Sequence, residues 1–202
     1  MKTRNLILCI TFISTCLLAI ATQAQSFFDY PRTANFVVIE YSQIITMIED
    51  PDPTPLLRIY GDGRVLVHYP VYMKRAGDYE MRLEDTELQQ LIASLELKGL
   101  FNYNKKNVEQ LKQQSRARQL TTTPKATMRS EDTYSVIKIN LGSYMPATSR
   151  LATPNFKNEL LLKNLKWEAK DYPDVVDLKN AASAEEQLKM FTNHPKLIKI
   201  KQ

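Results

Sequence analysis

Apolar and polar residues alternate on both sides of the tripeptide Gly61-Asp62-Gly63. The apolar residues fall at every second position: Leu57, Ile59, Val65, Val67 and Tyr69. A period of two places such side chains on one face of a strand, and glycine accepts the positive φ that tight hairpin turns require. The pattern therefore predicts a β-hairpin over residues 57–69 with one buried face. Arg58 and His68 should point away from that face.

Three more stretches have the β-branched, aromatic or alternating character of strands: residues 36–46, 77–83 and 133–141. Three prolines at alternate positions, Pro51, Pro53 and Pro55, lie between the first of these and the hairpin. Proline forbids a helix interior and is disfavoured inside a sheet, so we expect an exposed connection here.

A helical period follows the third predicted strand. Four apolar residues recur at helical spacing: Leu88, Leu91, Ile92 and Leu95. Asp85 or Thr86 can cap the first turn, Thr86 with Gln89 matches a capping box, and Gly99 is placed to end the helix. We predict a helix over residues 86–98 whose apolar stripe covers the hairpin.

The rest of the chain gives weaker patterns. Residues 102–131 are mostly polar, and both a polar helix near Val108–Gln119 and a mobile excursion fit them. Residues 142–156 contain two prolines and small polar residues, which predicts a loop. Leu160–Lys170 suits a strand or a helix, because its three consecutive leucines have no period.

Two helical pieces are predicted towards the C-terminus. Pro173 marks a break, after which residues 175–178 favour a short helical turn. Ser183 with Glu186 makes a second capping-box match and predicts a separate helix that His194-Pro195 ends. The expected fold is one α+β domain: a small antiparallel sheet covered by the 86–98 helix and the C-terminal pieces.

The first 24 residues have the three parts of a cleavable signal peptide. Lys2 and Arg4 form a basic start, an uncharged apolar stretch runs over 6–20, and small residues precede a cut after Ala24. The alternative is a retained membrane anchor, which would need roughly 20 apolar residues. We expect an exported protein, periplasmic or secreted, with a single domain over residues 25–202.

Removal of this segment would change the composition of the mature chain. Both cysteines, Cys9 and Cys16, would leave, so no disulfide or thiolate would be available. The net charge would fall from +5 to +3, too little to indicate a nucleic-acid partner. The remaining basic residues gather between Lys105 and Arg129, a stretch that would suit either solvent or an anionic surface.

The sequence contains no strong catalytic or metal-binding motif. The two histidines, His68 and His194, are far apart in sequence, and we predict no metal and no cofactor. No G-x-S-x-G or glycine-rich phosphate loop occurs. Acidic residues lie on or beside predicted strands, and a carboxylate pair among them would suit a hydrolase: Glu40, Asp62, Asp78 and Glu80.

Tyrosine and basic residues are concentrated around the hairpin. These residue types are favoured at binding interfaces, because they combine a wide contact surface with a polar tip. The predicted partner-binding residues are Arg58, Tyr60, Arg64, His68, Tyr69, Tyr72 and Lys74. Ordinary cross-strand pairing is the alternative explanation for the tyrosines.

The order of features over residues 57–101 is I-Y-G-D-G-R-V, a further strand, then E-D-T-E-L-Q-Q-L and G-L-F. This order resembles a group of uncharacterised exported bacterial domains with no assigned activity. Members often carry a cysteine-proline motif before the first strand, whereas this chain has Pro53-Thr54-Pro55. The resemblance implies a bacterial envelope setting and no functional residue.

The function predicted from the sequence is non-enzymatic binding of another protein or an envelope component. The alternative is hydrolysis of a cell-wall or extracellular polymer by paired carboxylates.

Overall fold

The structure is a computed structural model that describes residues 26–46, 49, 51–120 and 132–201. The predicted signal segment, with both cysteines and the expected cut after Ala24, lies outside these residues. So do Lys125 and Arg129 of the basic stretch.

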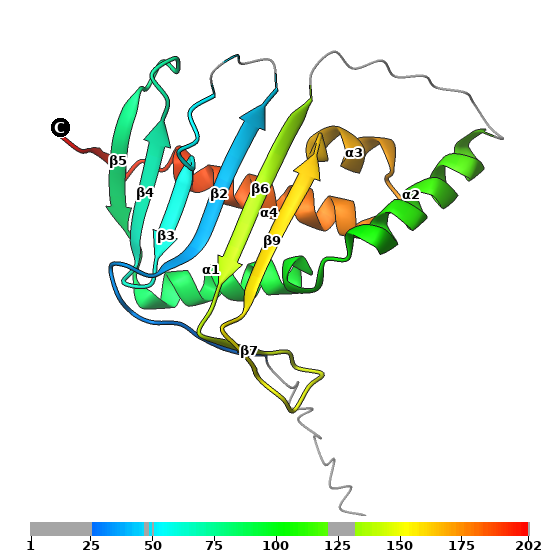
Figure 1. Cartoon of the computed structure of the whole chain (residues 1–202), viewed down its shortest axis with the longest axis horizontal. Coiled ribbons are helices and arrows are strands. Elements are labelled where there is room, and N and C mark those ends of the chain that lie inside the picture. The colour runs from blue at the N-terminus through cyan, green and yellow to red at the C-terminus, as the bar shows by residue number, and fades with distance from the viewer. Residues whose placement is uncertain (1–25, 47–48, 50, 121–131, 202) are drawn as a thin grey trace, which may run out of the picture.

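The centre of the fold is a seven-stranded antiparallel sheet in the order β10-β5-β4-β3-β2-β6-β9 (Figure 1). Its strands are β2 (Val37–Ile45), β3 (Leu57–Tyr60), β4 (Arg64–Tyr69), β5 (Gly77–Arg82), β6 (Thr133–Asn140), β9 (Lys157–Lys163) and β10 (Ile198–Lys199). The predicted hairpin is confirmed as β3 and β4, and the three other predicted strands as β2, β5 and β6. The short strand β10 was not predicted; it pairs with the outer edge of β5.

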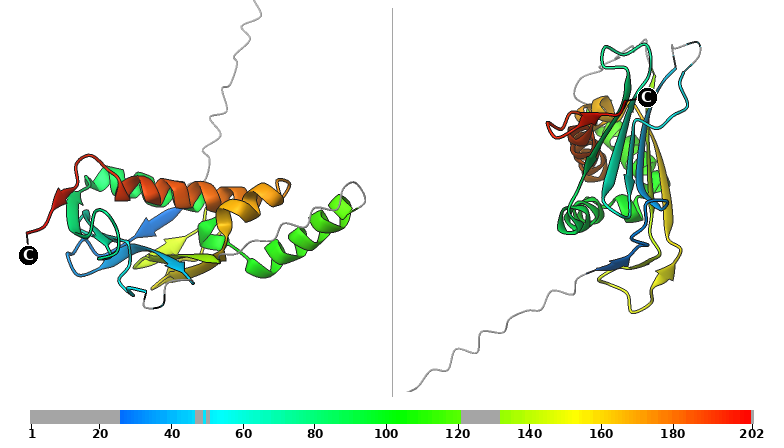
Figure 2. Two further views of the ribbon diagram at one scale, coloured as in Figure 1. Left: turned by 90° about the horizontal axis from the view of Figure 1, so that it is seen from above. Right: turned by 90° about the vertical axis from the view of Figure 1, so that its left-hand side faces the viewer.

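Helices cover one face of this sheet. They are α1 (Asp85–Leu97), α3 (Leu165–Asp171) and α4 (Val176–Thr192), while α2 (Lys105–Leu120) extends away beyond the edge formed by β9 (Figure 2). A 3-10 turn, η1 (Leu100–Asn102), joins α1 to the segment before α2. The opposite face of the sheet carries no helix in the described part of the chain, and we call it the open face.

The core lies between the sheet and α1 with α4. The apolar residues of the hairpin form the sheet side of this core, and Leu57, Ile59, Val65 and Val67 are fully buried. The predicted helix is confirmed as α1, whose Leu88, Leu91, Ile92 and Leu95 are buried. Its first turn is capped differently from the expectation: the backbone N–H of Glu84 donates to the carboxylate of Glu87 at 2.7 Å.

The polar stretch after α1 adopts the helical alternative over residues 105–120. Little apolar surface holds α2, but Val108 is buried and Ser115 donates a hydrogen bond of 2.6 Å to Asp174. Lys112 forms an ion pair with Glu168 of α3 at 2.5 Å. These contacts fix a helix that its own residues would hold only weakly. Residues 121–131 lie outside the described chain.

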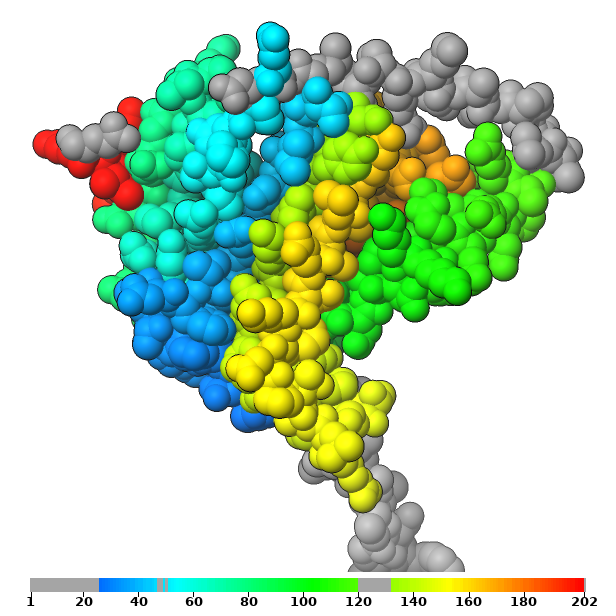
Figure 3. All heavy atoms as spheres, viewed as in Figure 1, coloured from blue at the N-terminus to red at the C-terminus, as the bar shows by residue number. Residues whose placement is uncertain are grey.

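The loop predicted over residues 142–156 is wrong in part. β7 (Ser143–Met145) lies between β1 (Phe27–Asp29) and β8 (Thr153–Pro154) in a second, three-stranded antiparallel sheet. Tyr144 packs against Phe101 and Phe156 at ring distances of 4.9 Å each. This sheet projects below the main body (Figure 3).

The C-terminal prediction needs two changes. Residues 160–170 contain both a strand and a helix, and Asn164 between them adopts φ 47 while its side chain accepts a hydrogen bond from the Thr133 N–H. The two predicted helical pieces form the single helix α4, so Ser183 is an interior residue and caps nothing. The apolar period of Leu178, Ala181, Ala184 and Leu188 continues across it, and burial of that stripe outweighs the local capping pattern.

Candidate functional site

The open face carries most of the residues predicted to bind a partner. Arg58 and Tyr60 on β3, and Arg64 and His68 on β4, occupy the positions that alternate with the buried ones. Tyr72 and Lys74 lie on the turn after β4, and the Tyr72 side chain is half exposed.

Tyr69 does not belong to this group. It lies on the core face of β4, is 8% exposed, and its hydroxyl donates to the backbone carbonyl of Thr192 at the end of α4. Its ring packs edge-on against Tyr79 at 5.6 Å. The period of two that places Val65 and Val67 in the core places Tyr69 there as well, so its assignment to the binding face was wrong.

The other predicted residues of the hairpin lie at its two ends. At the turn, the Arg64 guanidinium lies 4.1 Å from the centre of the Tyr60 ring and donates to the carbonyl of Ala34. His68 lies at the other end of β4, close to the prolines that precede β3. We call residues 51–55 the proline segment.

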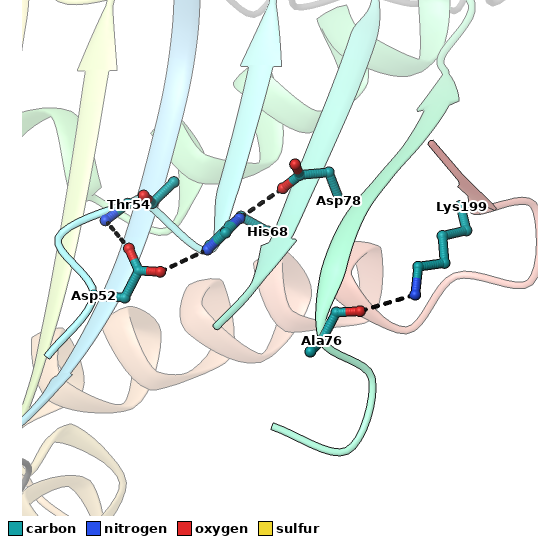
Figure 4. Close-up of polar contacts among 6 residues, drawn as sticks. All are labelled: Asp52, Thr54, His68, Ala76, Asp78 and Lys199. Carbon is teal, nitrogen blue, oxygen red and sulfur yellow. Dashed lines mark hydrogen bonds and ion pairs between the residues drawn. The ribbon is translucent and has the colours of Figure 1, made fainter. Parts of the chain in front are cut away.

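His68 links the proline segment to the sheet. Its Nδ1 lies 2.6 Å from Asp78 Oδ1 on β5, and its Nε2 lies 2.9 Å from Asp52 Oδ2 in the proline segment (Figure 4). The second oxygen of Asp52 accepts a hydrogen bond of 2.8 Å from the Thr54 N–H. We call this arrangement of Asp52, His68 and Asp78 the histidine bridge.

The bridge changes the pKa values of His68 and Asp52. Partial burial lowers the pKa of His68, but hydrogen bonds to the carboxylates of Asp78 and Asp52 outweigh this and raise it above its usual value. Hydrogen bonds from the Thr54 backbone and side chain, and then from His68, lower the pKa of Asp52 to about 2. The bridge thus favours an imidazolium held between two carboxylates.

This geometry does not match a hydrolytic relay. In such a relay one histidine nitrogen faces a nucleophile and the other a carboxylate. In the histidine bridge both ring nitrogens face carboxylates, so neither is directed at a nucleophile. Among the residues that the structure describes, no three His, Cys, Asp or Glu side chains gather as a metal site requires.

A row of alternating charges crosses the open face beside the bridge. Arg58 Nε lies 3.2 Å from Glu40 Oε2, and Lys138 Nζ lies 3.0 Å from Glu40 Oε1. Glu159 is opposite Lys138 on the edge strand β9. The hydrogen bond and charge of Glu40 raise the pKa of Lys138, which favours its ammonium form.

A groove with a volume of about 420 Å³ opens between the proline segment and strands β2 and β6. Its apolar lining comes from four prolines, from the exposed Ile44 and Tyr72, and from the buried Val136: Ile44, Pro51, Pro53, Pro55, Pro70, Tyr72 and Val136. Glu40, Lys138 and Glu159 supply charge at one side. Asp52 lines the groove and also belongs to the histidine bridge, so the two features share a wall.

A smaller hollow of about 340 Å³ lies on the other side of this wall. It is lined by His68, Asp78 and Arg58, with Ile200 from the C-terminal segment. Thr54 and Pro55 line both hollows, so the proline segment is the ridge that separates them.

The described part of the predicted anionic-surface stretch, residues 105–120, forms α2 and does not line the groove. Part of its charge is already neutralised, since Lys112 pairs with Glu109 and Glu168, and Arg118 with Asp174. Lys105, Lys106 and Arg116 have exposed side chains.

Sequence reasoning missed Asp52 and the groove. The pairing of His68 with Asp78 follows from the register of β4 with β5, which two adjacent predicted strands could have suggested. The return of Asp52 onto the sheet has no local signal, because a run of alternating prolines predicts only an exposed connection.

Comparison with known proteins adds no relative: no family model, no curated protein and no solved structure matches the chain. Within the described ranges, no helix combines the length and apolar character needed to cross a membrane.

Proposed function

We propose that this chain is an exported binding protein that takes a polypeptide partner on its open face, with the groove as the centre of the contact. The observation that carries the proposal is the apolar groove on the one sheet face that the described helices leave uncovered. Its volume falls within the range of about 300–1,000 Å³ that is usual for ligand sites.

The lining indicates the chemistry of the partner. Ile44 and Tyr72 are 41% and 50% exposed, so a partner that covered them would remove apolar surface from water. The neighbouring charges of Glu40, Lys138 and Glu159 would require a partner with complementary polar groups at the rim. A polypeptide segment with an apolar side chain between charged ones meets both requirements.

The sequence-predicted residues have different places in this proposal. Tyr72 lines the groove directly. Arg58 acts through its ion pair with Glu40, and His68 through Asp52. Tyr60 and Arg64 lie at the far end of the hairpin and would contact only a partner that extends along it.

The test uses the full chain in a pull-down with cross-linking from an envelope extract of its own organism. A partner recovered by the wild type should be lost with Ile44→Asp, which places a charge in the groove, and should remain with Leu151→Asp. Leu151 is 80% exposed and lies on the projecting small sheet region, away from the groove. Equal recovery by wild type and Ile44→Asp, with both folded by circular dichroism, would refute the groove as the contact.

The hydrolase alternative has one observation in its favour: Glu40 and Glu159 line the same groove and flank Lys138. Glycoside hydrolysis uses a pair of carboxyl groups that flank the bond to be cut. Release of reducing ends from cell-wall polysaccharide by the wild type, and its loss in Glu159→Gln, would favour this function over binding alone.

A further inference from the structure

We infer that a proton on His68 holds the proline segment against the sheet, and that loss of this proton releases the segment and reshapes the groove. Release of the segment follows from the histidine bridge alone. Its consequence for a partner in the groove rests on the proposed function.

The first step is a count of donors. A neutral imidazole carries one N–H, whereas the imidazolium carries two. His68 faces a carboxylate oxygen at each nitrogen, at 2.6 and 2.9 Å. Only the imidazolium can donate to both, and in the neutral ring one lone pair must face a carboxylate. The bridge therefore cannot keep both contacts after deprotonation.

The second step concerns what else holds the segment. Its last residue, Pro55, is buried, and the next one, Leu56, accepts a backbone hydrogen bond of 3.0 Å from the N–H of His68. Before that point, Pro51 and Pro53 are exposed. Among the described residues, the contact between Asp52 and His68 is the one hydrogen bond that joins residues 51–54 to β4. Its loss leaves these residues attached through Pro55 on one side and through the chain that comes from β2 on the other.

The third step asks which contact breaks. Asp78 is a residue of β5 and is held in place by the sheet. Both carboxylates are partly exposed to water, at 26% for Asp52 and 40% for Asp78, but Asp52 lies outside the sheet and has a second partner in the Thr54 N–H. We expect the remaining N–H of the neutral ring to stay with Asp78, the shorter contact, and Asp52 to leave.

Other charged groups around the ring do not substitute for the proton. Arg58 lines the same hollow, but its guanidinium pairs with Glu40. Glu80, the next outward-facing acid on β5, lies opposite Leu66. Lys199 on β10 directs its ammonium to the carbonyl of Ala76 at 3.0 Å (Figure 4). The two carboxylates raise the pKa of His68, so the change should occur above the ordinary histidine value of about 6.5.

The experiment follows two signals by NMR in the full chain without any partner: the chemical shifts of the His68 ring protons, and the nuclear Overhauser contacts between that ring and Asp52. We expect the contacts with Asp52 to be lost as His68 loses its proton, while those between the ring and Asp78 remain. The matched control is His194→Gln, which removes the only other histidine and should leave this loss unchanged.

His68→Gln cannot become charged, so the contacts between its residue 68 side chain and Asp52 should be the same at every pH. If that variant does not fold, Asp52→Asn serves instead: its amide can accept from the imidazolium and donate to the neutral ring, so its contacts with the ring should remain on both sides of the His68 titration. Wild-type contacts between the His68 ring and Asp52 that persist on both sides of the titration would overturn the inference. Because no partner is involved, this result is independent of the binding test with Ile44→Asp.

Discussion

The carboxylate of Glu185 accepts a hydrogen bond of 2.9 Å from the hydroxyl of Tyr41, in the interior between the sheet and α4. Ser135 donates to the same oxygen at 2.5 Å, and Lys189 Nζ lies 3.0 Å from it. Burial and the Glu185 charge raise the pKa of Tyr41, so the tyrosine remains a donor. A buried acid with three partners joins the helix layer to two neighbouring strands.

Glu185→Ala should therefore destabilise the fold. Two buried hydroxyls, those of Tyr41 and Ser135, would lose their acceptor, and an unsatisfied buried group costs about 1–3 kcal/mol. Urea denaturation should show a loss of at least about 2 kcal/mol in the free energy of unfolding. The exposed neighbour provides the control, and Glu186→Ala should change stability by less than about 0.5 kcal/mol. Equal effects of the two variants would contradict this role.

Leu95 and Leu97 provide a second matched pair on α1. Leu95 is fully buried, whereas Leu97 is 82% exposed. Leu95→Ala should cost about 2–5 kcal/mol, the usual range for a buried leucine that leaves a cavity. Leu97→Ala should stay within about 0.5 kcal/mol of the wild type. The midpoints of thermal or urea denaturation would measure both, and a large effect at Leu97 would mean that another surface covers it.

Gly63 and Gly99 both adopt positive φ, at 83° and 78°, but their surroundings differ. A Cβ at residue 63 would overlap the carbonyl oxygen of Leu83, whereas one at residue 99 would meet no atom within 4 Å. Gly99→Ala should cost about 1–2 kcal/mol for the left-handed backbone alone. Gly63→Ala should cost more, because the turn must also move away from Leu83. Equal losses in the free energy of unfolding would show that the turn relaxes freely.

The histidine bridge predicts a pH profile of stability. The pKa of His68 is raised on folding, so its contribution is complete below the unfolded value of about 6.5 and is lost as pH rises through the folded pKa. The pKa of Asp52 is lowered to about 2, so its contribution is complete above the unfolded value near 4 and is lost as pH falls through about 2.

The bridge should thus stabilise the fold most between about pH 4 and 6.5. The free energy of unfolding of the wild type, minus that of His68→Gln, should be greatest in this window and should decline on both sides. His194→Gln supplies the control profile. A difference that does not vary with pH would mean that His68 contributes to stability by packing alone.

The sequence was sufficient to predict the elements whose apolar residues repeat at a short, regular spacing. The β3–β4 hairpin and α1 each show several apolar residues at one period, and tertiary packing reinforces that period. Tyr69 shows that position in the alternation decides burial more than residue type does. It shares a strand face with Val67 and is buried with it, although tyrosine is common at binding surfaces.

Long-range contacts account for what could not be predicted. β1 and β7 are three residues each and are separated by more than a hundred residues, so neither has a pattern without the other. α4 continues through the capping-box match at Ser183, because burial of its apolar stripe stabilises one continuous helix more than a cap at Ser183 would stabilise a separate one. The bridge joins Asp52 to His68, and Asp52 also lines the groove, so both features depend on a loop that returns onto the sheet without a local signal.

The alternating prolines of the groove wall have a mechanical consequence. Each proline fixes its own φ and restricts the residue before it, so residues 51–54 have few conformations available even without the bridge. A released segment would move as a stiff part of the connection between β2 and β3, and would lose little entropy when it returns to the sheet. In the mechanism that we propose, release and return of the segment are therefore reversible, and one proton on His68 determines which of two conformations the segment adopts.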